Sequence, residues 1–326
     1  MKYVDLPESA ANRHLPFYLA VEEYVARRFA AEPELFFMWQ VDPTVICGRN
    51  QMIAAEVDLP YCREHGIEVW RRRSGGGAVY ADRSNIMMSY VTTGTDIGSV
   101  FAGYTARMAA FLRSLGLDAS DTSRNDVLIG SRKVSGNAFY RSGSRCIAHG
   151  TMLYNADPSR MAAVLTPSAA KLSANGVKSV PSRITTIREH SSISLHCFMA
   201  AARNYMCGAE AVSLSEADIQ EVEAIEKQYL SDQWLWQHSP KGDFEKCMRF
   251  DGVGELQLSL TLSHGLIHNL FLTGDFFITG DIDASLLAPL RGVPYTPAAV
   301  DEALRNADPA SAVSGLTREM VSRLLF

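Results

Sequence analysis

Apolar residues recur along the chain with two different periods. Intervals of three and four residues predict amphipathic helices over residues 15–30 and 99–117. On the first of these helices, Glu22 and Glu23 are expected on the exposed face, because unpaired carboxylates are rarely buried. A shorter helix is expected over residues 58–66, ending at a glycine.

Short apolar runs bounded by turn residues predict strands. In the first half of the chain these runs cover residues 35–40, 44–47, 67–70, 84–91 and 127–129. One predicted strand therefore leads directly into a glycine-rich stretch, and another leads away from it. Such flanking strands can hold a loop against a ligand more firmly than a free surface loop is held.

The last third of the chain predicts a separate module. A helix is expected over residues 215–229, and Pro240-Lys241-Gly242 then marks a boundary between residues 1–242 and residues 243–326. Trp234 and Trp236, just before this boundary, are expected to pack between the two domains. Beyond it, a hairpin and two helices are expected, over residues 254–262, 265–273, 284–290 and 297–305.

Composition narrows the class of protein. The chain has 326 residues, of which 47% are hydrophobic and 21% charged, as in ordinary two-domain globular proteins. A formal net charge of -5 gives no general attraction for nucleic acid, and no apolar run reaches the roughly 18 residues of a membrane span. The six cysteines show no zinc-binding spacing and are scattered, which favours a reducing, cytoplasmic location.

The first candidate site is the stretch RRRSGGGAVYAD at residues 71–82. Arginine carries a fixed positive charge that forks onto anionic oxygens, and consecutive glycines allow the backbone to approach a ligand closely. The stretch does not have the spacing of a dinucleotide-binding motif or a P-loop. It predicts either a loop that receives an anionic small molecule or a tight turn beside a solvated basic patch.

The second candidate site is SRNDVLIGSRKVSGN at residues 123–137. A predicted hairpin places Lys133 on one arm and Asn125 and Asp126 on the other. An ammonium group is a compact charge that can contact a carboxylate and a phosphate together. The alternative is an exposed lysine that protects an edge strand from aggregation.

A third stretch, CIAHGTMLY, begins at Cys146 and contains His149 within an apolar strand pattern. The imidazole of His149 can contact a bound group or satisfy a buried hydrogen bond. Cys146 fits a small apolar core residue.

Taken in order, RRRSGGGAVYAD, NDVLIGSRKVSGNAF, AHGTMLYNAD and KLSANGVKSVPSRITT resemble the lipoate-protein ligase A family, from about residue 12 to the C-terminus. The resemblance implies an α+β fold. Its large catalytic domain, like class II synthetases and biotin ligases, would contain mixed, mostly antiparallel sheets flanked by helices, and a small α+β accessory domain would follow.

The resemblance also implies the reaction. Lipoate would attack the α-phosphorus of ATP, with Mg²⁺, to give lipoyl-adenylate and pyrophosphate. A lysine amine on a carrier would then attack the mixed anhydride. The implied carriers are lipoyl domains of 2-oxoacid dehydrogenase E2 subunits and the glycine cleavage H protein.

Site residues are implied by matching the family's motifs. Lys133 would be catalytic and contact both lipoate and the α-phosphate. ATP or the adenylate would be bound by Arg72, Gly77, Ala78, Val79, Tyr80, Asn125 and Asp126, with Asp126 near Mg²⁺. Lipoate would be bordered by Ser74, Gly75, Gly76 and His149.

Two residues depart from the family pattern. Ala81 and Ala148 stand where histidines are common, so no role of those two imidazoles carries over. Two alternatives therefore stay open: a cysteine-dependent octanoyl or lipoyl acyltransferase that uses Cys146, and a protein that binds lipoate or its carrier without turnover. The biotin-ligase motif G-R-G-R-x-G-R does not occur in the chain.

Overall fold

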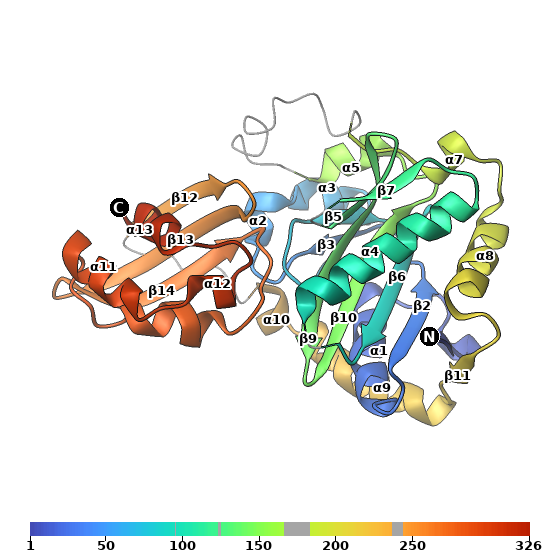
Figure 1. Cartoon of the computed structure of the whole chain (residues 1–326), viewed down its shortest axis with the longest axis horizontal. Helices are drawn as coiled ribbons and strands as arrows, with labels where there is room; N and C mark the ends of the chain where they lie inside the picture. The colour runs from blue at the N-terminus through green and yellow to red at the C-terminus, as the bar shows by residue number, and fades with distance from the viewer. Residues whose placement is uncertain (95, 123–124, 166–182, 237–243) are drawn as a thin grey trace.

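The computed structural model describes residues 1–94, 96–122, 125–165, 183–236 and 244–326 (Figure 1). Its large domain is built on an eight-stranded mixed sheet with the strand order β11-β1-β2-β6-β10-β9-β8-β7. Pairing is parallel at β11-β1-β2 and antiparallel from β2 to β7. The strands are β1 (Lys2–Asp5), β2 (Glu34–Trp39), β6 (Asn85–Thr92), β7 (Ala119–Asp121), β8 (Asp126–Ile129), β9 (Arg132–Ser142), β10 (Arg145–Leu153) and β11 (Ala211–Ser213).

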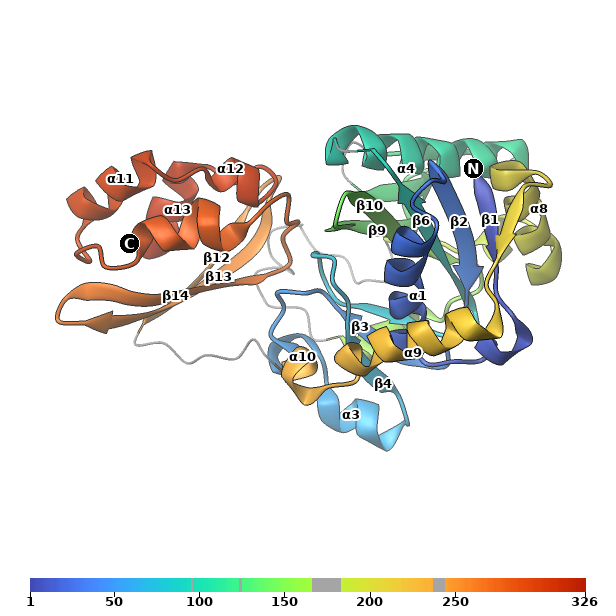
Figure 2. The same cartoon turned by 90° about the horizontal axis from the view of Figure 1, so that it is seen from below.

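Helices cover both faces of this sheet (Figure 2). On one face lie α4 (Ile97–Ser114) and α8 (Leu195–Cys207), whose apolar residues share a buried cluster with β2, β6 and β10. On the other face lie α1 (Leu15–Arg28) and α9 (Glu216–Tyr229). Because β6 is buried at every position, its apolar residues 86–88 and 90–91 do not alternate with exposed polar ones.

A second, three-stranded sheet has the order β4-β3-β5. Its strands are β3 (Thr44–Cys47), β4 (Glu68–Arg71) and β5 (Val79–Ala81), and the glycine-rich stretch connects the last two. Shorter helices complete the large domain: η1 (Glu8–Ala10), α2 (Ile53–Glu56), α3 (Leu59–Glu64), α5 (Pro158–Val164), α7 (Ile187–His190) and α10 (Asp232–Trp236). The small sheet therefore holds the ends of the candidate loop.

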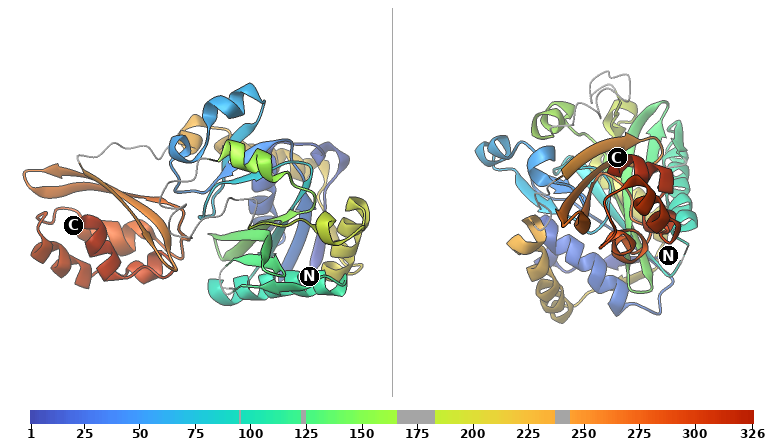
Figure 3. Two further views of the ribbon diagram at one scale, coloured as in Figure 1. Left: turned by 90° about the horizontal axis from the view of Figure 1, so that it is seen from above. Right: turned by 90° about the vertical axis from the view of Figure 1, so that its left-hand side faces the viewer.

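The C-terminal residues form their own α+β unit, visible from two further directions in Figure 3. The antiparallel sheet β12-β13-β14 packs against helices on one side, and its buried cluster runs from Phe250 to Leu325. Its elements are β12 (Phe244–Phe250), β13 (Gly254–Ser263), β14 (Leu266–Gly274), η3 (Asp283–Leu287), η4 (Ala288–Leu290), α11 (Pro297–Arg305), α12 (Pro309–Ala312) and α13 (Arg318–Leu325).

The predicted α+β fold class is confirmed. The division at residues 242 and 243 falls outside the described residues and stays a prediction. Within the described part of the chain, every helix falls short of the length and apolar character that a membrane crossing needs.

The expected exposure of Glu22 and Glu23 is wrong. Glu22 is fully buried and Glu23 is 8% exposed. Helix α1 carries both residues between the large sheet and the glycine-rich loop, where cationic and hydroxyl partners replace the water that a carboxylate loses.

Candidate functional site

Arg71 and Arg72 stabilise the glycine-rich loop and its surroundings by hydrogen bonds from its buried side. Arg71 is 2% exposed and donates to the backbone carbonyls of Gly48, Arg49, Gln51 and Leu235. Arg72 donates to Ser74 Oγ and to the carbonyls of Ile46, Gly75 and Gly77. The irregular backbone of such a loop leaves many carbonyls unpaired, and the planar guanidinium satisfies several at once. Burial lowers the pKa of Arg72 to about 10, so it stays charged at neutral pH.

Arg73 differs from its two neighbours because it forms an ion pair. Its Nε lies 2.6 Å from Glu23 Oε1, and it also donates to the hydroxyl of Tyr229. Trp234 also binds this stretch, because its Nε1 donates a hydrogen bond to the carbonyl of Arg71 at 2.9 Å. The expected packing of Trp234 and Trp236 between domains is therefore wrong. Trp234 packs inside the large domain, against Tyr229 at the end of α9, and Trp236 is 44% exposed.

Two glycines of the loop are required by close backbone contact. A Cβ on Gly75 would lie 2.2 Å from the carbonyl oxygen of Phe276, in the C-terminal domain. Gly76 has a φ of +84°, which favours glycine, and its N–H donates to the same carbonyl at 3.0 Å. The loop thus makes direct backbone contact with the accessory domain.

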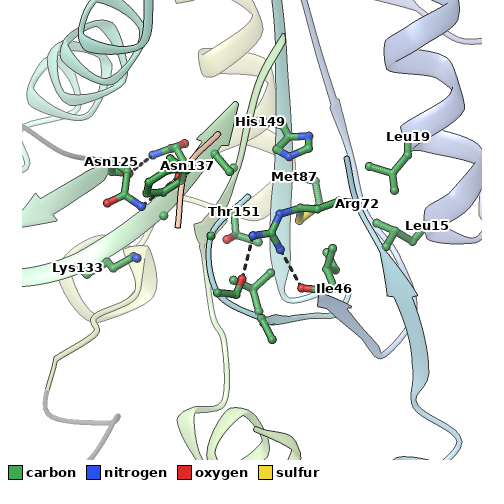
Figure 4. Close-up of a pocket in the computed structure, with 18 of the residues that line it drawn as sticks. Leu15, Leu19, Ile46, Arg72, Met87, Asn125, Lys133, Asn137, His149 and Thr151 are labelled. Atoms are coloured by element: carbon green, nitrogen blue, oxygen red, sulfur yellow. Dashed lines mark hydrogen bonds between the residues drawn. The ribbon is translucent and has the colours of Figure 1, made fainter. Parts of the chain in front are cut away.

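A cavity of about 180 Å³ opens beside this loop (Figure 4). One end is apolar and is lined by Leu15, Leu19, Trp39, Ile46 and Met87. The opposite end is polar and is lined by Asn125, Lys133 and Asn137, and Thr151 lies between the two ends. The cavity suits a molecule with an apolar tail and an anionic head.

Lys133 provides the cation at the polar end. Its Nζ lies 2.7 Å from Oδ1 of Asp126. On the same side, Asn125 and Asn137 donate to each other's backbone carbonyls at 3.2 and 3.0 Å. The predicted hairpin of β8 and β9 is present, and it brings all four side chains together.

His149 lies deeper, beneath α1. Its Nδ1 is 2.9 Å from Oε2 of Glu22, and its Nε2 is 2.6 Å from Oγ of Ser74. Glu22 also accepts hydrogen bonds from Ser89 and Tyr140. The imidazole is thus fixed in a buried polar network and also lines the cavity.

The predicted site residues divide into two groups. Eight of them line the 180 Å³ cavity: Arg72, Gly76, Gly77, Ala78, Val79, Asn125, Lys133 and His149. The other four stand around it. Ser74 holds His149, Gly75 contacts the accessory domain, Tyr80 donates its hydroxyl to Asp82, and Asp126 pairs with Lys133.

Several lining residues were missed by sequence reasoning. In the sequence, no local pattern distinguishes these apolar residues from ordinary core residues: Leu15, Leu19, Trp39 and Met87. Phe277 comes from the C-terminal domain and stacks on Phe139 of β9, with ring centroids 5.8 Å apart. Asn137 could have been found, because it follows directly on the K-V-S-G stretch of Lys133.

The two departures from the family pattern lie outside the cavity. Ala81 is fully buried in the cluster beneath α1, and Ala148 is fully buried in the cluster beneath α4. Neither lines the cavity.

Cys146 is also remote from the cavity. It is 1% exposed, packs in the cluster beneath α4, and burial raises the pKa of its thiol to about 11. A nucleophilic cysteine needs an accessible thiolate, and Cys146 has neither property.

Comparison with known proteins agrees with this picture. Residues 15–206 match the family described as "Lipoyl protein ligase A/B catalytic domain", and residues 239–325 match "Bacterial lipoate protein ligase C-terminus". The chain is 32% identical to lipoate-protein ligase 1 of Staphylococcus aureus, over 94% of this chain and 95% of that protein. It is 29% identical to the lipoate-protein ligase LplJ of Bacillus subtilis, over 94% of this chain and 96% of that protein.

Two solved structures share the fold. P. falciparum LipL1 in complex with lipoate has a TM-score of 0.76 at 18% identity and covers 96% of this chain and 95% of that one. A bipartite lipoate protein ligase from Thermoplasma acidophilum, analysed with its E2 lipoyl domain, has a TM-score of 0.64 at 26% identity, covering 74% of this chain and 98% of that one.

Fold and cavity together define an α+β protein with a large mixed-sheet domain and a C-terminal accessory domain. The chain belongs to the lipoate-protein ligase family. The predicted resemblance and the prediction of a ligase enzyme are therefore confirmed.

Proposed function

We propose that this protein activates lipoate with ATP and transfers the lipoyl group to a lysine of a carrier domain. The observation that carries the proposal is the two-ended cavity, with an apolar end for an acyl tail and Lys133 at the other end. A solved relative is described as lipoate-protein ligase A bound with ATP, and two others as bound to lipoate or lipoic acid.

In the first step, a lipoate oxygen bonds to the α-phosphorus of ATP, and the bond to the departing pyrophosphate breaks. The ammonium of Lys133 stabilises the negative charge that builds between carboxylate and phosphate. In the second step, a carrier amine attacks the acyl carbon, AMP leaves with the electron pair of the anhydride bond, and the amine loses a proton.

The remaining predicted residues take supporting roles. The backbone of residues 77–79 and the guanidinium of Arg72 would bind the nucleotide, with Tyr80 behind them, and His149 would fix the wall beside the acyl tail. Asp126 would hold Mg²⁺ together with the phosphates, since Mg²⁺ commonly uses one or two carboxylates beside substrate oxygens. Mg²⁺ would neutralise phosphate charge at that point.

We extend the proposal to the carriers. Lipoyl domains of 2-oxoacid dehydrogenase E2 subunits and the glycine cleavage H protein are the proposed acceptors, and an E2 lipoyl domain accompanies the Thermoplasma relative. A cytoplasmic location is proposed from the six cysteines, none of which forms a disulfide within the structure described.

The test is mass spectrometry of an apo lipoyl domain incubated with the protein, lipoate and MgATP. The expected result is one added lipoyl group per domain, and loss of that product with Lys133→Ala. Pyrophosphate release is measured in parallel. Binding of lipoate and ATP without pyrophosphate release would instead identify a binding protein without turnover.

A further inference from the structure

A second cavity, of about 620 Å³, lies between the two domains. Its wall on the large domain is formed by residues 49, 50, 73 and 75 and by the end of β9. Its opposite wall is formed by β14 and residues 278–283. It is distinct from the 180 Å³ cavity: Gly75 lines the second cavity and Gly76 the first. The rings of Phe139 and Phe277 stack on each other, but Phe277 lines the first cavity and Phe139 lines the second.

The wall on the large domain is cationic. Arg49, Arg73 and Arg141 all line it. Arg73 is neutralised by Glu23. Among the described residues, neither Arg49 nor Arg141 forms an ion pair. Two guanidinium groups therefore face the cavity without a neutralising carboxylate from the described chain.

The surroundings of Arg49 disfavour its charged form. It lies over the ring of Trp234 at 5.8 Å from the centroid, and both its burial and the neighbouring charge of Arg73 lower its pKa. An anion that enters the cavity would reduce the repulsion between these two like charges.

Asn50 supplies an independent indication of a ligand. The residue is 6% exposed and lines the cavity, and its side-chain Nδ2 has no hydrogen-bond partner among the described residues. An unsatisfied buried donor is rare in proteins and is commonly explained by a missing acceptor. An oxygen atom of a bound molecule would be that acceptor.

The opposite wall contributes apolar surface and two carboxylates, of which only Asp283 has a cationic partner among the described residues. Asp283 pairs with Arg291 at 3.1 Å, and Asp281 accepts from the N–H of Ala284 at 3.0 Å. Phe271 and Ile278 provide an apolar surface on the same side. The cavity therefore combines a cationic, hydrogen-bond-donating wall with a wall that is apolar apart from these two carboxylates.

We propose that the interdomain cavity binds a small phosphate-bearing molecule, with its oxygens on Arg49, Arg141 and Asn50. Arginine prefers such oxygens because its planar donors match them in pairs. The molecule is inorganic pyrophosphate or a nucleoside phosphate whose base lies on the apolar wall. The site is separate from Lys133, and the proposal holds whichever reaction the first cavity performs.

The test is titration calorimetry of the full-length protein with two probes, inorganic pyrophosphate and guanosine diphosphate. Arg141→Ala removes an exposed cation and Asn50→Asp places a negative charge at the unsatisfied donor. Each is expected to weaken binding by roughly tenfold or more. Arg305→Ala, on the far side of the C-terminal domain, is the matched control and is expected to bind like the unmodified protein. Thermal unfolding confirms that each variant is folded.

The two probes identify the source of the phosphate. Equal affinity for both probes supports recognition of the phosphate group alone, and tighter binding of guanosine diphosphate supports a nucleoside phosphate. Failure of the unmodified protein to bind either probe would overturn the proposal. So would binding that Lys133→Ala abolishes and that Arg141→Ala and Asn50→Asp leave intact, because the anion would then occupy the first cavity. Carrier lipoylation is measured separately, so failure of one proposal does not imply failure of the other.

Discussion

The ammonium of Lys133 and the carboxylate of Asp126 are 2.7 Å apart at the rim of the 180 Å³ cavity. The side chain of Lys133 reaches this position across Gly136, where a Cβ would lie 2.6 Å from its Nζ. The backbone of Lys133 is bonded on its other side to Arg183 and Thr185. The amine is therefore positioned by a strand, a glycine and a carboxylate.

Asp126→Asn is expected to lower pyrophosphate release at least tenfold while hardly changing stability. The substitution removes the charge that orients Lys133 and would hold Mg²⁺. Both side chains are about one-third exposed, so the pair contributes no more than about 1 kcal/mol to folding. Pyrophosphate release and chemical denaturation measure the two effects, with Asp118→Asn at an exposed site as the control. Unchanged release would remove Asp126 from the mechanism.

Glu22→Ala is expected to destabilise the protein by about 3–5 kcal/mol, because it leaves His149 and Ser89 without their buried acceptor. Glu22→Gln keeps the shape and is expected to cost less. Guanidinium denaturation measures both. Glu302→Ala, at a side chain 65% exposed, is the control and is expected to change stability by less than about 0.5 kcal/mol. A Glu22→Ala protein as stable as this control would contradict the role of the network.

The elements of the fold were largely predictable from the sequence. Residues 44–47 and 297–305 coincide with β3 and α11, because local periodicity and turn residues set both. The hairpin that carries Lys133 also follows from its local pattern. Such elements depend on neighbours along the chain.

The environment of the site was less predictable, because it depends on contacts between distant segments. Glu22 is buried because β6 and β10 bring Ser89 and His149 beneath α1, 67 and 127 residues away in sequence. Phe277 reaches the cavity only because the C-terminal domain packs on the glycine-rich loop. No local pattern encodes either contact.

Phe277→Ala is expected to weaken lipoate binding about two- to tenfold. Its ring stacks on Phe139 and lines the cavity, and an aromatic pair of this kind contributes about 0.5–1.5 kcal/mol beyond its buried area. Calorimetry with lipoate measures the effect. Phe326→Ala removes a comparable stack on Tyr295, within the C-terminal domain, and is expected to leave the affinity unchanged. Equal losses in both variants would indicate a general effect on that domain.

Gly75→Ala is expected to separate the glycine-rich loop from the accessory domain. The new Cβ would meet a backbone oxygen of Phe276 at 2.2 Å, and backbone cannot rotate away as a side chain can. Hydrogen exchange at the amide of Gly76 should accelerate, since this amide donates to the same oxygen. Gly103→Ala is the matched control: a Cβ there meets nothing within 4 Å, and alanine within α4 should stabilise by about 0.5–1 kcal/mol. Unchanged exchange at Gly76 would show that the two segments tolerate the Cβ.

Alkylation of thiols is expected to leave Cys146 unmodified and lipoylation intact, and Cys146→Ala then separates a ligase from a cysteine-dependent acyltransferase. With the pKa of the Cys146 thiol at about 11, only about one part in a thousand is thiolate at pH 8. Because the thiolate fraction rises with pH, this thiol should resist iodoacetamide throughout the neutral range, whereas the exposed Cys197 should react. Peptide mass spectrometry identifies the modified cysteines, and carrier lipoylation is assayed on the same sample. Cys146→Ala should retain activity. If that variant were inactive while still folded and able to bind lipoate, the thioester route would return as the mechanism.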